Sequence, residues 1–152
     1  MRPKDALLLS HVRKNARTQL TKLSRQTSIP VSTISEHLKR YEKTYIKRYT
    51  TLVNFRKLGY DVQVNLLVRV SKTNRDGLKA YLINHPNVNT LFRISNGFDF
   101  LVECVFKNLK DMSEFLEQLD QFNVLEKKEF YLLEDLKRET FMSNPEVAKL
   151  MI

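Results

Sequence analysis

The sequence has one cysteine, three glycines and no long apolar run. A helix that crosses a bilayer needs about 20 apolar residues, so a membrane-spanning protein is excluded. Cys104 cannot form an internal disulfide, which fits a reducing interior. Gly59, Gly77 and Gly97 stand far apart, so the chain has no glycine-rich phosphate loop. We therefore expect a cytoplasmic protein with no membrane partner.

Patterns typical of catalysis and of metal binding are also missing. His11, His37 and His85 fall in predicted helices, and no cysteine or carboxylate stands at metal-ligand spacing from them. Apolar residues flank Cys104 on its own strand face, which predicts a buried, inert thiol. The first five residues lead into no cleavage site of a secretory signal. We expect no enzyme, no metal and no cofactor.

Positive charge is concentrated at one end of the chain. The 152 residues carry 26 Lys and Arg against 17 Asp and Glu, a formal charge of +9. Residues 1–60 hold 14 basic and 3 acidic residues, or +11, whereas residues 61–152 hold 12 and 14, or −2. A charge excess confined to one end favours a nucleic-acid-binding segment joined to a part with another task.

The basic end shows three short helical patterns. Apolar residues recur at helical spacing over residues 5–15, 18–26 and 31–43. Pro30 separates the second helical pattern from the third, because proline disfavours helical geometry in the residue before it. The third helix could begin at Pro30, or Thr33 and Glu36 could form a capping box. Three short helices with a tight turn and a basic surface predict a helix-turn-helix unit.

On the outer side of the third predicted helix, hydrogen-bonding residues lie near the N-terminus and cations lie further along the helix. A recognition helix uses its N-terminal residues on base edges and its cations on phosphates. We therefore assign Ser32, Thr33, Ser35 and Glu36 to base edges. The candidate phosphate contacts are Arg17, Arg25, Lys39, Arg40, Lys47 and Arg48.

Four segments of this basic end resemble the Lrp/AsnC family, the leucine-responsive or feast/famine transcription regulators of bacteria and archaea. They are Asn15-Ala16-Arg17, Leu23-Ser24-Arg25, Ile29-Pro30-Val31-Ser32-Thr33-Ile34 and Leu38-Lys39-Arg40-Tyr41-Glu42. Residues 45–50 resemble the strand with which the family leaves its DNA-binding domain. Ser28 and Tyr45 depart from the family pattern, which often has glycine at both positions. The resemblance implies a DNA-binding regulator that works as a homodimer or a larger oligomer.

The rest of the chain alternates strand and helix patterns. Residues 45–54 are rich in β-branched and aromatic residues and predict a strand, and Gly59 marks the boundary that follows. Five alternating apolar residues from Val62 to Val70 predict a half-buried strand. Val88, Thr90, Phe92 and Ile94 predict one face of the next strand, which leads into an Asn96-Gly97 hairpin turn. The following strand should present Phe98, Phe100, Val102, Cys104 and Phe106 on one face. Residues 130–133 supply the last strand.

Helical patterns at residues 78–85 and 112–119 follow the strands predicted over residues 62–70 and 98–106. The resulting order, βαββαβ, predicts a ferredoxin-like domain, so the whole chain belongs to the α+β class. The expected parts are a winged-helix-like helix-turn-helix domain, a linker strand and hinge, a ferredoxin-like effector and oligomerisation domain, and a tail that forms a short helix. Their bounds are residues 1–45, 46–60, 61–135 and 136–152. The tail could dock on a neighbouring subunit, but packing on its own domain is the simpler expectation.

The family resemblance also implies an effector site in the hairpin. Asn96, Gly97, Phe98 and Asp99 resemble the segment near which an amino-acid effector binds between subunits. Residues 122–129 depart from the family, which has Gly-Val and Thr residues there, so a different effector or none is the alternative. A second reading of the βαββαβ pattern is an RNA-binding domain whose Phe98 and Phe100 stack on bases. Its net negative charge argues against that reading.

Overall fold

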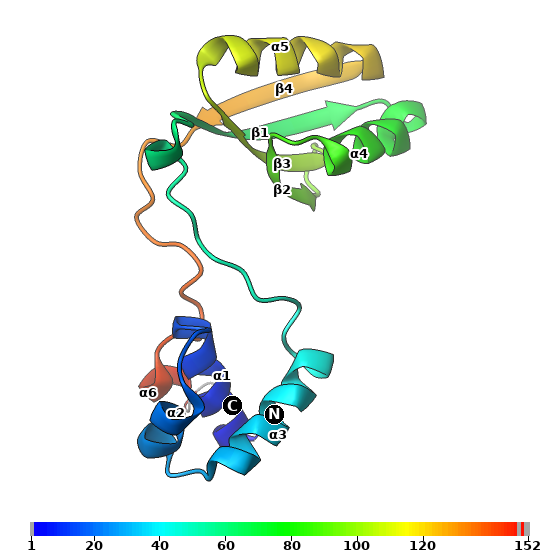
Figure 1. Cartoon of the computed structure of the whole chain (residues 1–152). Helices are drawn as coiled ribbons and strands as arrows, with labels where there is room; N and C mark the ends of the chain where they lie inside the picture. The colour runs from blue at the N-terminus through cyan, green and yellow to red at the C-terminus, as the bar shows by residue number, and fades with distance from the viewer. Residues whose placement is uncertain (1, 149, 151–152) are drawn as a thin grey trace. The chain divides into compact units, whose positions relative to one another are not determined.

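The computed structural model describes residues 2–148 and residue 150. The chain forms two compact units, one from residues 1–52 with residues 136–152 and one from residues 53–135 (Figure 1). The helices of the first unit are α1 (Pro3–Lys14), α2 (Leu20–Thr27), α3 (Val31–Thr44) and α6 (Pro145–Ala148). The second unit contains β1 (Val62–Val70), α4 (Arg75–Asn84), β2 (Val88–Arg93), β3 (Phe100–Phe106), α5 (Leu109–Leu119) and β4 (Val124–Tyr131). Short 3₁₀ turns lie at Arg56–Leu58, Lys72–Asn74 and Asp120–Phe122.

The first unit is built around a small apolar core. Its buried members are Leu8, Leu23, Ile29, Ile34 and Tyr41, which come from α1, α2, the turn before α3 and α3 itself. The three predicted helices are present, with α1 beginning two residues earlier than expected and α2 also displaced by up to two residues. Helix α3 begins at Val31, as the predicted range of residues 31–43 has it, but Pro30 is the N-cap and not the first helical residue, and no side chain caps this helix.

The C-terminal segment belongs to the first unit. Helix α6 packs beside α1, and its Ala148 is fully buried. Arg13 of α1 forms an ion pair with Glu139, and its Nε donates to the carbonyl oxygen of Phe141 at 3.2 Å. The tail therefore packs on the helix-turn-helix unit of its own chain. The tail has too few apolar residues to indicate which domain it joins, and its docking depends on long-range contacts with α1.

The second unit contains one four-stranded antiparallel sheet. Its strand order is β2-β3-β1-β4, as the predicted ferredoxin-like arrangement requires. In β1 and β3 the alternate residues of one face are buried, and they pack against Leu78 and Leu82 of α4 and Phe115 of α5. Both helices therefore cover the same face of the sheet. The opposite face carries no helix of the second unit.

The register of β2 differs from the prediction. The pairing with β3 shifts between Val88 and Thr90, so Leu91 packs on the core and Phe92 is 55% exposed on the other face. An extra residue at such a bulge moves every later side chain to the other face of the sheet. The alternation of apolar and polar residues in the sequence does not indicate this bulge. The predicted face formed by Val88, Thr90, Phe92 and Ile94 is therefore wrong.

Two further strand predictions need correction. Residues 45–54 form no strand, and their backbone is irregular. β-Branched and aromatic residues favour a strand only where a neighbouring strand supplies hydrogen bonds, and no strand of the described chain pairs with this segment. The last strand begins at Val124, six residues earlier than expected, because charged residues such as Lys127 and Glu129 interrupt its apolar pattern. Within residues 2–148 and 150, no helix is both long enough and apolar enough to span a bilayer.

Candidate nucleic-acid interface

The turn between α2 and α3 sets the position of the second helix of the motif. Ser28 ends α2 in the left-handed conformation, with φ 57° and ψ 31°, and its N–H donates to the carbonyl oxygen of Ser24 at 2.9 Å. Glycine adopts this conformation without the steric cost that a side chain brings. Ser28 therefore keeps the turn geometry that a glycine would supply.

Helix α3 separates a buried face from an exposed face. Ile34 and Tyr41 are fully buried against the core of the first unit. Of the predicted DNA-contacting residues on α3, four are exposed and two are half-buried. The exposed residues are Ser32, Glu36, Lys39 and Arg40, and the half-buried residues are Thr33 and Ser35. The helix thus presents hydrogen-bonding and basic side chains on one accessible face.

The remaining predicted phosphate contacts lie outside α3. Arg25 is exposed on α2, and Lys47 and Arg48 are exposed on the irregular segment that follows α3. Arg17 lies in the turn between α1 and α2, where its backbone N–H donates to Asn15 Oδ1 at 2.9 Å. It lines a shallow hollow together with residues 49–51. The predicted cations are therefore accessible, and those outside α3 lie on three separate segments of the first unit.

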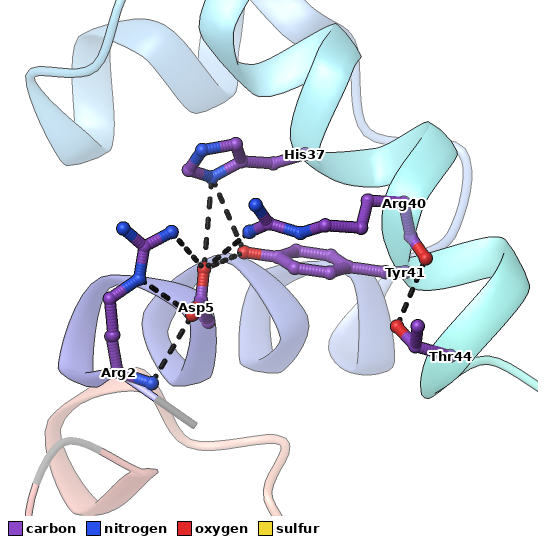
Figure 2. A network of polar contacts seen from close by, with 6 residues as sticks. All are labelled: Arg2, Asp5, His37, Arg40, Tyr41 and Thr44. Carbon is purple, nitrogen blue, oxygen red and sulfur yellow. Dashed lines mark hydrogen bonds and ion pairs between the residues drawn. The ribbon is translucent and has the colours of Figure 1, made fainter.

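Sequence reasoning missed a buried acidic residue that connects α1 to α3. Figure 2 shows the carboxylate of Asp5 between Arg2 and three residues of α3. Asp5 Oδ1 accepts hydrogen bonds from Tyr41 Oη at 2.5 Å and from Arg40 Nη2 at 3.2 Å. His37 Nδ1 lies 3.8 Å from the same oxygen and 3.4 Å from Tyr41 Oη. One carboxylate therefore lies against three side chains of α3.

Asp5 also organises the start of α1. Its Oδ2 accepts hydrogen bonds from the backbone N–H and from the Nε of Arg2, both at 3.2 Å. A carboxylate in the first turn caps the free N–H groups of a helix and complements its dipole. The signal that could have found this residue is its rarity, because Asp5 is one of three acidic residues among the first 60.

The surroundings of Asp5 shift two pKa values in opposite directions. Burial by itself would raise the pKa of the Asp5 carboxyl, but hydrogen bonds from Tyr41 and Arg2 outweigh it and hold that pKa well below its usual range. Burial and the neighbouring Asp5 carboxylate raise the pKa of Tyr41. Asp5 is therefore ionised and Tyr41 is neutral at physiological pH.

The four candidate effector residues lie between β2 and β3. Asn96 and Gly97 have φ values of 69° and 91°, as the predicted turn requires. The loop is longer than a two-residue turn, because the flanking backbone hydrogen bond runs from the N–H of Ile94 to the carbonyl oxygen of Asp99. A role for Asn96, Gly97, Phe98 and Asp99 in effector binding stays a prediction.

Asp99 is buried and has partners within the second unit. Its carboxylate accepts a hydrogen bond from the backbone N–H of Val70 at 2.9 Å and pairs with Arg75 Nε at 2.8 Å. These contacts join the end of β1 to the start of α4. Asp99 therefore has a structural role within its own unit.

The aromatic residues of the RNA-binding alternative are not presented as stacking surfaces. Phe100 is 1% exposed and lies in the core that the helices cover. Phe98 belongs to the loop before β3, where Lys128 Nζ lies 5.2 Å from the centre of its ring. Stacking on bases needs aromatic rings that are exposed on the open face of the sheet. The arrangement therefore gives no support to RNA binding by this sheet.

Comparison with known proteins matches both units to one family. Residues 63–141 match the Lrp/AsnC ligand binding domain, and residues 1–44 match a winged helix-turn-helix DNA-binding domain. The chain belongs to the Lrp/AsnC family. This confirms the resemblance of the four N-terminal segments and the predicted fold class. The Lrp/AsnC chain is accordingly a DNA-binding transcription regulator with a domain of the ligand-binding type.

Relatives of this Lrp/AsnC protein agree with that assignment. The HTH-type transcriptional regulator FL11 of Pyrococcus furiosus is 24% identical over 137 residues, which cover 90% of this chain and 91% of the relative. The structure of LrpC from Bacillus subtilis superposes with a TM-score of 0.80 at 18% identity, covering 88% of this chain and 95% of that one. The L-Met complex of a transcriptional regulator from Neisseria meningitidis gives a TM-score of 0.84 at 20% identity, covering 91% and 93%. All three relatives are transcriptional regulators by name.

Proposed function

We propose that this Lrp/AsnC regulator binds double-stranded DNA sequence-specifically through the exposed face of α3. The observation that carries the proposal is the composition of that face, where hydrogen-bonding residues at the N-terminal half precede cations. Ser32, Thr33, Ser35 and Glu36 contact base edges in the major groove. The phosphate contacts come from Arg17, Arg25, Lys39, Arg40, Lys47 and Arg48. The protein acts on the nucleoid in the cytoplasm and has no enzymatic activity.

The open face of the sheet supports a homodimer. Leu67 of β1 pairs with Leu101 of β3, which in turn pairs with Phe92 of β2, so the three side chains form one row on the face without helices. Phe130 lies on the same face, because it pairs with Asn65, and it is 52% exposed. Phe92 is exposed as well, and Leu67 and Leu101 are half-buried. Apolar side chains that reach the surface side by side mark interaction surfaces. We place the contact between two subunits on this face, and tetramers or octamers would be assemblies of such dimers.

A dimer carries two recognition helices related by a two-fold axis. Such an arrangement reads two half-sites about 34–36 Å apart, or a multiple of that spacing, along one side of the duplex. The operator is therefore an imperfect palindrome. A single helix-turn-helix unit contacts too little DNA for strong discrimination between sequences, and pairing the units removes this limit.

An amino acid is the proposed effector of the ligand-binding domain. The Neisseria meningitidis regulator in complex with L-Met shows that a protein of this fold binds one. In this chain the hairpin residues Asn96, Gly97, Phe98 and Asp99 are the proposed contacts. A ligand that binds only the folded protein raises its melting temperature, so a thermal-shift screen of the twenty amino acids tests the proposal. A screen with no shift would contradict an amino-acid effector.

Substitutions on α3 test the DNA-binding proposal. We expect Lys39→Ala to weaken binding to all duplexes and Ser35→Ala to change the preference between sequences, because cations contact phosphates and hydroxyls contact bases. Fluorescence anisotropy with a selected operator and a random-sequence duplex measures both effects. Lys110→Ala is the matched control, since Lys110 is exposed on α5, outside the proposed interface. Equal losses on operator and random DNA for every substitution on the exposed face would contradict base recognition.

A further inference from the structure

The cluster around Asp5 links the proposed DNA-binding face to the body of the first unit. We propose that Asp5 is a positioning residue for DNA binding, which holds the guanidinium of Arg40 in place to contact a backbone phosphate. This inference rests on the proposed function of α3. It concerns Asp5, which lies on α1 and does not itself face the DNA.

The contact between Asp5 and Arg40 leaves most of the arginine available. Arg40 Nη2 lies 3.2 Å from Asp5 Oδ1, and the side chain of Arg40 remains 48% exposed. A guanidinium carries five N–H donors in a rigid planar fork. One donor directed at Asp5 therefore fixes the plane of the group while other donors stay free for a phosphate oxygen. The Tyr41 ring lies beneath the same guanidinium, 5.5 Å from ring centre to Cζ, and restrains it further.

Asp5 is itself held firmly enough to act as an anchor. Its side chain is 6% exposed, and both of its oxygens accept hydrogen bonds. Tyr41, which donates the 2.5 Å hydrogen bond, is fully buried in the core. A long side chain loses rotamer freedom when it binds a partner, and holding it beforehand reduces that cost. Arg40 is thus held in position before DNA binds, whereas none of the contacts of Asp5 involves the neighbouring Lys39.

The negative charge of Asp5 does not oppose DNA in this arrangement. Arg2 and Arg40 both contact the carboxylate, so two positive charges accompany one negative charge. The cluster keeps a net positive charge even though it contains an acid. An unpaired carboxylate near the interface would instead repel phosphate.

A double-mutant cycle between Asp5 and Arg40 tests this inference. The probe is a random-sequence 30-bp duplex, titrated at low and moderate salt by fluorescence anisotropy. We expect Arg40→Ala to weaken binding about fivefold, as the loss of about 1 kcal/mol implies. Asp5→Asn should cause most of that loss by itself, and the double variant should bind no more weakly than Arg40→Ala. Asp5→Asn, Arg40→Ala and the double variant should each also make the negative slope of log K against log salt concentration shallower by about 0.9, the value for one phosphate contact.

Two controls separate positioning from folding. Tyr41→Phe removes a hydrogen bond to Asp5 but leaves Arg40 in contact with it, so we expect a lower melting temperature and unchanged DNA affinity. Arg25 lies on another helix, so the loss of DNA affinity caused by Arg25→Ala should add to the loss caused by Asp5→Asn. Additive effects of Asp5→Asn and Arg40→Ala, an unchanged or tighter Asp5→Asn complex, or a loss for Tyr41→Phe equal to that of Asp5→Asn would each overturn the inference. Failure of the wild-type protein to bind any duplex would instead overturn the proposed function.

Discussion

Asp5 shows how a single residue can link stability to function in this protein. It lies in a sequence stretch dominated by basic residues, and the pattern of apolar residues gives no reason to bury it. Burial follows from its partners, because Tyr41 and Arg2 provide the hydrogen bonds that a buried carboxylate needs. Sequence reasoning can find the helices that carry these groups but cannot foresee that they meet at one point.

The lowered pKa of the Asp5 carboxyl predicts a specific dependence of stability on pH. In the unfolded chain this carboxyl takes up a proton near its ordinary pKa of about 3.8, whereas in the folded protein it stays ionised to lower pH. Unfolded molecules then bind more protons, so the stabilisation by Asp5 is complete above about pH 5 and is lost as the pH falls through 4 and below. Asp5→Asn should cost about 1–3 kcal/mol near pH 7 and progressively less at acid pH.

Denaturant unfolding followed by far-UV circular dichroism at pH 7, 5, 4 and 3 measures this dependence. Glu36→Gln removes an exposed carboxylate from α3 and is the matched control. A stability difference between wild type and Asp5→Asn that stays constant over this pH range would contradict the role assigned to the carboxylate.

The thiol of Cys104 should be unreactive in the folded protein. The side chain is fully buried, and burial, together with nearby Glu103, raises the pKa of the thiol to about 12. Only the thiolate reacts, so a disulfide reagent at pH 8 should modify Cys104 in guanidinium chloride and not in buffer. Ser113→Cys, at an exposed position on α5, provides a thiol that should react in the native state. Rapid labelling of native wild type would contradict the burial of Cys104.

At the scale of elements, local periodicity predicted most helices and strands but not their partners. The β1 pattern of alternating apolar residues and the helical patterns over residues 31–43 and 78–85 follow from spacing alone. The predicted strand over residues 45–54 is wrong because strand propensity cannot provide a pairing partner. The register of β2 is wrong because a bulge adds one residue that the alternation does not reveal.

Helix α6 is the element whose role depends most on long-range contacts. It has only four residues and cannot be stable alone, so its packing beside α1 holds it. Ala148→Glu would place a charge in that fully buried position, and we expect the tail to detach from α1. Limited trypsin digestion should then cut after Lys137 faster than in the wild type. Val147→Glu, at a 43% exposed neighbour, should leave the rate unchanged. Equal rates for both variants and wild type would contradict the docking of α6.

At the scale of the whole molecule, the uneven distribution of charge along the chain corresponds to two domains with different functions. The first 60 residues carry the formal +11 and include the helix-turn-helix, whereas the sheet unit matches a ligand-binding domain. Composition and periodicity were enough to predict this division, whereas the family was predicted from the resemblance of the four N-terminal segments. They could not assign the tail to the first unit, because its place depends on contacts with α1 that lie more than 120 residues away in sequence.

The open sheet face predicts the oligomeric state. Phe92→Asp and Phe130→Asp place charges within the proposed dimer contact, so both should shift the molecular mass toward the 18.0 kDa of a single chain. Ile83→Asp, at a 60% exposed position on α4, is the matched control and should keep the wild-type mass. Sedimentation velocity measures all three. A wild-type protein that is monomeric at micromolar concentration would contradict the proposed interface.

We propose that DNA lies against α3 and the basic segment after it. Photo-crosslinking of the full chain to a duplex, followed by tryptic mapping, tests it most directly. We expect crosslinked peptides from residues 32–48, where the exposed face of α3, Lys47 and Arg48 lie. Crosslinks confined to the sheet unit, at Phe98 and the start of β3, would contradict the claim.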